Sequence, residues 1–254
     1  MSRFLRLVFL MLGAVMLPVD SAARGFVDSG PAPRFLEVSV HAIGGGSLIT
    51  ENYMGCFEEI TEMNTSGGFT IGAGASAVFG VRNWLGVGTE LNLISQRYRT
   101  DMAVSNEDAT TVSNIFLRNS TVVANIPVYL QFRFNVMPDV RWIVDAGLYY
   151  AYGISGSQSQ SIYMSQVNSL GQLVNKRFTD KVKYYNSSET FINTFGRGDI
   201  GVHVATALKF GKHLSLGVKM DFGLKNVAHI EGNAGIVCPN VHNFGYTFTI
   251  GYTL

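Results

Sequence analysis

The sequence predicts an all-β fold: a closed antiparallel eight-stranded transmembrane β-barrel with long extracellular loops and short periplasmic turns. Three observations predict it. Eight segments alternate with a period of two, glycines gather on one of the two faces, and long and short connections alternate. Only 15% of the 254 residues are charged, while 47% are hydrophobic and 28 are glycine. This composition is typical of a chain that is partly exposed to lipid.

The start of the chain has the pattern of a cleaved signal peptide. Arg3 and Arg6 precede an apolar run over 7–17, and small residues at 21–23 offer a cleavage site. The run is too short for a membrane-spanning helix, which needs about 20 apolar residues. We therefore predict a signal peptide at 1–23, a periplasmic N-terminal lead at 24–34 and an outer-membrane β-barrel at 35–254.

Eight segments alternate apolar residues with small or polar ones, which is the periodicity of a strand. They are 35–46, 68–82, 85–98, 120–136, 141–154, 197–210, 213–227 and 243–254. In the last segment Phe244, Tyr246 and Phe248 share one face, and Gly245 and Thr247 share the other. Most segments exceed the roughly 9 to 11 residues that a tilted strand needs to cross a bilayer.

The glycines distinguish a barrel from a soluble sheet. Gly88, Gly147, Gly201, Gly217 and Gly251 all fall on the face that carries the charged residues. The interior of an eight-stranded barrel is just wide enough for side chains, so long polar residues there need neighbours without a side chain. A soluble sheet that faces water has no such requirement.

The connections alternate in length. Those at 82–84, 137–140 and 211–213 are short, and the long ones are 46–67, 99–119, 155–196 and 229–242. This is the arrangement of outer-membrane barrels with both termini on the periplasmic side, and it predicts location in the bacterial outer membrane. The segment 155–175 is rich in Ser, Gln and Asn, and we expect it to be a polar, mobile loop.

Four short motifs resemble the PorT-like family of small outer-membrane β-barrels. They are the strand LGVGTELNL at 85–93 with an inward Glu90, the Ile126-Pro127 step, the DIGV start at 199–202 and the closing FTIGY at 248–252. The resemblance covers most of the mature chain and implies the same fold. One member of that family is linked to an outer-membrane protein secretion system, so the resemblance implies a secretion-machinery partner as one alternative. The chain differs from many outer-membrane barrels in that it ends in Leu254 instead of Phe and has a long connection at 155–196.

Charged residues on the inward face predict an interior polar network. Acids and bases balance in this set, which comprises Glu37, His41, Arg82, Glu90, Arg133, Asp145, Asp199, His203, Lys209, Lys219, Asp221 and Lys225. One interpretation is a conduit or ligand site, because ionisable groups at membrane depth are functional candidates. The other is a lumen plugged by ion pairs. We favour the plug, because so narrow an interior leaves no aqueous channel.

Other site chemistry is sparse. Cys56 and Cys238 are a candidate disulfide, because their loops adjoin where the first and last strands close the barrel. His229, Glu231 and His242 match no zinc spacing, and there is no Gly-x-Ser-x-Gly elbow or phosphate-binding loop. We therefore predict no catalytic residue, no metal site and no cofactor.

The leading hypothesis is a non-enzymatic barrel with a charge-plugged lumen. It acts through its extracellular loops, or as an accessory in surface binding, membrane integrity or protein export. The alternatives are a small porin-like transport channel and a barrel enzyme acting on lipid or peptide. We expect a monomer whose partners are outer-membrane lipid and lipopolysaccharide, with a surface ligand or secretion machinery as further candidates. The near-neutral net charge of +1 argues against nucleic acid.

Overall fold

The computed structural model describes residues 25–51, 53–54, 57–105, 111–191, 194–229 and 241–254. Its strands are β1 (Leu36–Thr50), β2 (Ile60–Gly80), β3 (Leu85–Ser105), β4 (Thr111–Met137), β5 (Val140–Val167), β6 (Leu173–Lys183), β7 (Thr194–Phe195), β8 (Gly198–Phe210), β9 (Leu214–Gly223), β10 (Ala228–His229) and β11 (His242–Thr253). Among the described residues, no helix has the length and apolar character needed to cross a membrane.

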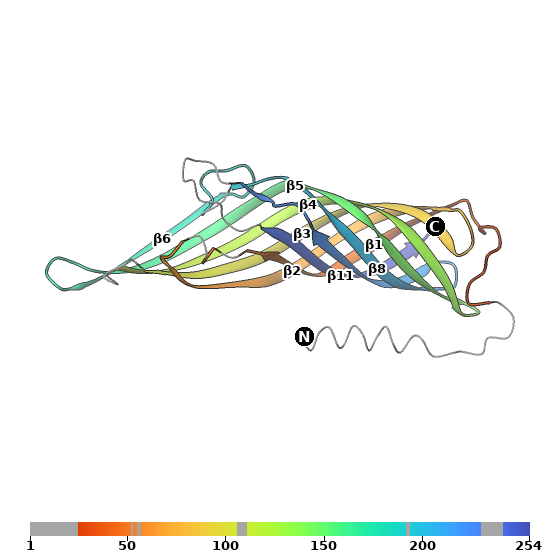
Figure 1. Ribbon diagram of the computed structural model, residues 1–254, viewed down its shortest axis with the longest axis horizontal. Coiled ribbons are helices and arrows are strands. Elements are labelled where there is room, and N and C mark those ends of the chain that lie inside the picture. Colours follow the sequence, from red (N-terminus) through yellow and green to blue (C-terminus); the bar gives the residue numbers. More distant parts are fainter. Residues whose placement is uncertain (1–24, 52, 55–56, 106–110, 192–193, 230–240) are drawn as a thin grey trace.

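Eight of these strands form a closed antiparallel ring (Figure 1). Their hydrogen-bonded order is β4-β3-β2-β1-β11-β9-β8-β5, and β5 pairs back onto β4. The first and last strands close the ring, from Ser39 opposite Thr253 to Thr50 opposite His242. Closure leaves the ring without an unpaired edge. The predicted eight-stranded barrel is confirmed.

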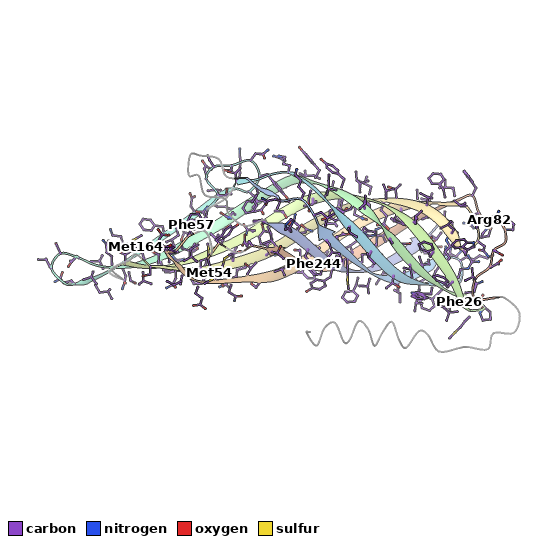
Figure 2. All side chains as sticks on the ribbon, in the orientation of Figure 1. Phe26, Met54, Phe57, Arg82, Met164 and Phe244 are labelled. Atoms are coloured by element: carbon purple, nitrogen blue, oxygen red, sulfur yellow. The ribbon has the colours of Figure 1, made fainter. Side chains whose placement is uncertain are left out.

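The two faces of each strand differ in the way that lipid and a narrow lumen require. In β11, Phe248 and Ile250 are 62% and 61% exposed, whereas Thr249 between them is 9% exposed. The outward face is therefore an apolar band for lipid, and the inward face carries small and polar side chains. Figure 2 shows the side chains along the whole length of the barrel.

The prediction of long loops at 99–119 and 155–196 is wrong, because the described residues of these segments are largely strand. β3 and β4 remain paired up to Ser105 opposite Val112, and β5 continues to Val167 with β6 paired beside it. Most of 99–119 and 155–175 is therefore ordered sheet beyond the barrel. The sequence hides the strand at 155–161 because serine and glutamine alternate there without a hydrophobic period. The order comes from backbone bonds to the neighbouring strands.

Two β-bulges lie where the barrel passes into this extended sheet. The register of β2 with β3 shifts between Gly67 and Ile71, and that of β4 with β5 shifts between Val122 and Val123. Each bulge inserts one extra residue and reverses which alternate residues face inward. The parity of the barrel therefore does not continue along β2 and β5 into the extension.

A hydrophobic core, which we call the cap, lies at this end of the molecule. Figure 2 shows Met54 and Phe57 there, at the end opposite Phe26 and Arg82. Its buried residues are Ile49, Tyr53, Ile60, Tyr98, Met102, Ile115, Leu117, Tyr184, Phe195, Val227, Ala228 and Val241. Buried apolar side chains from segments far apart in sequence thus order the ends of the barrel strands.

Aromatic rings form the floor of the cap. The hydroxyls of Tyr98 and Tyr184 share a hydrogen bond, and the Tyr184 ring stacks on Phe195 with centroids 4.4 Å apart. Burial raises the pKa of the Tyr184 hydroxyl well above the ordinary value, so this group remains a neutral hydrogen-bonding partner. These rings border the outer part of the lumen.

A carboxyl in the cap predicts that cap stability depends on pH. Glu51 Oε2 accepts a hydrogen bond from Tyr53 Oη at 2.7 Å, and Oε1 accepts one from Thr100. Burial raises the pKa of this carboxyl, and the two hydroxyl donors offset only part of that rise. A raised pKa in the folded state gives stability that is present below the unfolded pKa and is lost as pH rises through the folded pKa.

We therefore expect the cap to protect its amides from hydrogen exchange better at mildly acidic pH than at pH 8, after correction for intrinsic exchange rates. Glu51→Gln should abolish this difference, because it keeps the side chain neutral. Glu62→Gln, which changes an exposed carboxyl on β2, is the matched control and should leave the difference unchanged. Equal pH dependence in wild type and Glu51→Gln would contradict the prediction.

The N-terminal lead packs on the short-turn end in its described part. The ring of Phe26 stacks on Phe134 at 5.0 Å, and Asn83 Nδ2 donates to Asp28 Oδ2 at 2.5 Å. Arg34 Nη1 donates to the carbonyl of Leu254 at 2.8 Å. The predicted signal peptide, 1–23, lies outside the described residues.

Candidate functional site

The first layer of luminal polar side chains lies toward the short-turn end. Glu37 on β1 accepts a hydrogen bond from Lys209 Nζ on β8 at 2.7 Å and lies 3.4 Å from Arg133 Nη1 on β4. Arg133 Nε donates to Gln131 Oε1 at 2.8 Å. Three strands are thus tied across the lumen, with one carboxylate between two cations.

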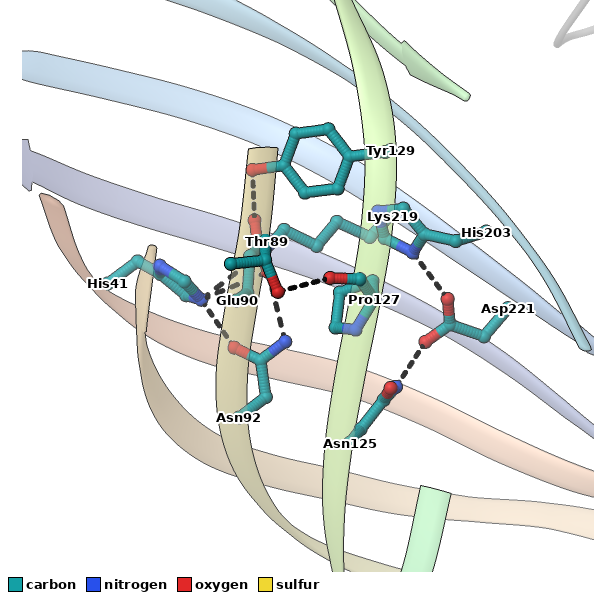
Figure 3. A network of polar contacts seen from close by, with 10 residues as sticks. All are labelled: His41, Thr89, Glu90, Asn92, Asn125, Pro127, Tyr129, His203, Lys219 and Asp221. Atoms are coloured by element: carbon teal, nitrogen blue, oxygen red, sulfur yellow. Dashed lines mark hydrogen bonds and ion pairs between the residues drawn. The ribbon is translucent and has the colours of Figure 1, made fainter. Parts of the chain in front are cut away.

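The second layer centres on a buried carboxylate (Figure 3). Glu90 on β3 forms an ion pair with Lys219 on β9, and it accepts hydrogen bonds from Asn92 Nδ2 at 2.9 Å and Tyr129 Oη at 3.3 Å. His41 Nε2 lies 2.7 Å from Asn92 Oδ1 and 3.6 Å from Glu90 Oε2. The contacts from Lys219, Asn92 and Tyr129 offset the cost of removing the carboxylate from water.

The third layer joins β8, β9 and β4. His203 Nδ1 lies 2.6 Å from Asp221 Oδ1, and Asp221 Oδ2 accepts a hydrogen bond from Asn125 Nδ2 at 2.9 Å. The His203 side chain is 1% exposed. Its ring lies against Tyr129 with centroids 5.6 Å apart, so the tyrosine connects this layer to the second one.

The fourth group lies closest to the cap. Asp199 Oδ2 on β8 accepts hydrogen bonds from Tyr149 Oη at 3.0 Å and Asn243 Nδ2 at 2.9 Å. Its other carboxylate oxygen is buried and has no hydrogen-bond partner among the described residues. This carboxylate borders the outer end of the polar core.

The polar layers separate two small cavities. A cavity of about 80 Å³ is lined by Glu37, Asp145 and other polar residues, and one of about 60 Å³ toward the cap is lined by Asn125, Asp199 and Tyr184. Each has room for a few water molecules. The lumen can therefore hold water on both sides of the second layer.

A glycine makes the second layer sterically feasible. A Cβ atom on Gly88 would lie 2.4 Å from the ring of Tyr129, the residue paired with it on the neighbouring strand β4. Only a residue without a side chain leaves space for the ring at that point. Gly88 on the inward face therefore leaves room for the Tyr129 ring.

The structure places most of the predicted network residues in the lumen. They are Glu37, His41, Glu90, Arg133, Asp145, Asp199, His203, Lys209, Lys219 and Asp221. Arg82 and Lys225 need correction. Arg82 is exposed in the turn between β2 and β3, and Lys225 is exposed beyond the end of β9. Alternation no longer determines the direction of a side chain once the strand has ended.

The network also contains uncharged residues that the sequence prediction omitted. They are Asn92, Asn125, Tyr129, Gln131, Tyr149 and Asn243. All of them lie on the inward parity of their strands, so strand parity could have identified them. Cys56 and Cys238 lie outside the described residues, and their disulfide stays a prediction.

A comparison with known protein families agrees with this architecture. A family model described as "Outer membrane protein beta-barrel domain" matches residues 34–229. A search of curated proteins found no matching relative.

Solved structures similar to this chain include two outer-membrane proteins. One is Ail, the attachment invasion locus protein of Yersinia pestis, in complex with the heparin analogue sucrose octasulfate. It is 10% identical with a TM-score of 0.37, over 87% of this chain and 100% of that one. The other is the outer membrane protein OprG from Pseudomonas aeruginosa, 10% identical with a TM-score of 0.40, over 90% of this chain and 99% of that one.

Proposed function

Because this chain belongs to the family of outer-membrane protein β-barrel domains, we propose that it is a non-enzymatic barrel with a plugged lumen that acts through its extracellular cap and sheet. Its place is the bacterial outer membrane. Its role is surface binding or membrane integrity. A PorT-like accessory part in protein export stays a prediction that rests on the sequence resemblance.

The observation that carries the proposal is the second luminal layer. Side chains from β1, β3, β4 and β9 meet there, and the ion pair of Glu90 with Lys219 lies across the lumen. A solute would have to separate this pair, and breaking a buried ion pair costs about 3 to 5 kcal/mol when one charge is left alone. The cap supplies a further barrier. With the lumen occupied, the surface of the cap and extended sheet is what remains for a partner.

Planar-bilayer recording tests the plugged lumen. We expect purified wild-type protein to give no stable single-channel steps under conditions in which a porin of known conductance gives them. Insertion of the folded protein is verified separately by the difference in gel mobility between unboiled and boiled samples. Stable steps from wild type would overturn the plug and favour the alternative of a small transport channel.

A further inference from the structure

The outward face of the extended sheet carries a cluster of basic residues. This basic face consists of Arg97, Arg99, Arg118, Lys181 and Lys183, contributed by β3, β4 and β6. Four of them are exposed, and Arg99 is 43% exposed in its side chain. Figure 1 shows β5 and β6 continuing together beyond the closed barrel, which places this sheet at one end of the molecule.

Strand register brings these side chains into two adjacent rows. In the first row Arg99 lies opposite Arg118, Arg118 opposite Ser159, and Ser159 opposite Lys181. The second row, in the same strand order, is Arg97, Ser120, Ser157 and Lys183. Directly opposed Cβ atoms in a sheet are about 5 Å apart. Five cations therefore surround a floor of small serine hydroxyls.

The charge of the basic face is poorly compensated within the chain. Arg99 Nε pairs with Asp101 Oδ1 at 2.7 Å. In the described part of the chain, Arg97, Arg118, Lys181 and Lys183 form no ion pair with a carboxylate. Like charges directly opposite each other, as in Arg99 and Arg118, destabilise a sheet. A bound anion with several charges would remove this repulsion.

The basic face lies just above the apolar band. Leu93, Tyr152 and Ile154 are exposed apolar or aromatic residues on the outward side of the same strands. Ser157, the first residue of the serine floor, follows Ile154 by three positions, which is about 10 Å along a strand. The basic face is therefore at the depth where lipid headgroups meet the hydrocarbon boundary.

We propose that the basic face binds the phosphate groups of lipopolysaccharide in the outer leaflet. The proposal rests on the proposed function, which places the cap end outside the cell. Arginine presents paired N–H donors that match phosphate oxygens, and the lysines add point charges. The serine hydroxyls can donate to the same oxygens or to sugar hydroxyls. Height above the apolar band favours a membrane-bound glycolipid over a soluble polyanion.

The test compares two triple variants of the full chain in detergent micelles. Arg97→Gln, Arg118→Gln and Lys181→Gln together neutralise the basic face. The matched control, Arg34→Gln, Arg82→Gln and Lys212→Gln, removes the same charge from exposed positions at the short-turn end. Each protein is titrated with fluorescent lipopolysaccharide, with its dephosphorylated form and with heparin. Gel mobility before and after boiling verifies that both variants are folded.

We expect the basic-face variant to bind lipopolysaccharide about a hundredfold more weakly, because each basic residue near an anionic lipid surface contributes about a factor of five. The control should stay within about twofold of wild type. Wild type should bind the dephosphorylated form as weakly as the variant binds the intact one.

Three results would overturn the proposal: equal binding by both variants, equal binding of dephosphorylated lipopolysaccharide by wild type, or tighter binding of heparin than of lipopolysaccharide. Bilayer recording on the same preparations separates this proposal from the plugged lumen, because the basic face lies outside the barrel interior. If the basic-face variant loses lipopolysaccharide binding and no protein conducts, both proposals are supported. If the proteins conduct but lipopolysaccharide binding follows the expected pattern, only the plugged lumen is refuted.

Discussion

Replacing Lys219 by Met is expected to lower the free energy of unfolding by about 3 to 5 kcal/mol, because it leaves Glu90 buried without its cation. Glu90 is 5% exposed, and Lys219 Nζ also lies 3.3 Å from His41 Nε2. The remaining hydrogen bonds to Glu90 come from neutral groups and do not neutralise its charge. Urea unfolding of the barrel in detergent micelles, followed by tryptophan fluorescence, measures the change.

Lys212→Met is the matched control, because Lys212 is exposed in the turn between β8 and β9. It should change the free energy of unfolding by less than about 0.5 kcal/mol. Combining Lys219→Met with Glu90→Gln should recover part of the loss, since removing both charges leaves none stranded. If Lys219→Met alone costs less than about 1 kcal/mol, Glu90 is not a buried charge that depends on this lysine.

The second large effect is expected from Gly201→Ala. A Cβ atom at this position would lie 2.1 Å from the carbonyl oxygen of Phe222 and 2.4 Å from the ring of Tyr149. The first neighbour is backbone in the paired strand β9, so it cannot move without breaking the sheet register. Overpacking costs about 1 to 3 kcal/mol, and more where the backbone must shift, so we expect about 3 kcal/mol or greater.

Gly245→Ala provides the control for Gly201→Ala. Gly245 also lies on the inward face, on β11, but the nearest atom to its added Cβ is Asp221 Cβ at 4.0 Å. It should be nearly neutral in the same urea assay, with normal heat-dependent gel mobility. Equal stability of the two alanine variants would show that the lumen is not tightly packed at Gly201.

Strand parity predicted the charged half of the luminal site because the lipid-facing side excludes charge. Glu90 and Lys219 could be assigned to the interior from sequence alone, but their pairing could not, since β3 and β9 are not neighbours in the ring. Asn125 and Tyr149 share the inward parity, but only charged residues were assigned to the network, because amide and phenol side chains by themselves occur on either face of a strand. Arg82 was misplaced because a turn does not preserve alternation.

The cap and the extended sheet were beyond the reach of periodicity. In β5, Gln158 is 1% exposed while its serine neighbours face outward, yet both residue types are polar and give no hydropathy signal. The bulge opposite Val122 and Val123 adds one residue to β5. It reverses which alternate residues of β5 face inward, so the parity of the barrel cannot be extrapolated into the extended sheet. Ile49 and Val241 are far apart in sequence. They pack in the same core because β1 and β11 pair to close the ring.

The sequence by itself determined the strands of the barrel, their alternating short turns and the face that lipid covers. It could do so because a bilayer requires a repeated apolar face and a narrow lumen requires inward glycines, and both are local patterns. Tertiary structure alone decided which luminal charges pair, where the bulges reverse the faces, and how arginines and lysines from three strands form the basic face. Those features depend on contacts between residues far apart in sequence, which no local pattern records.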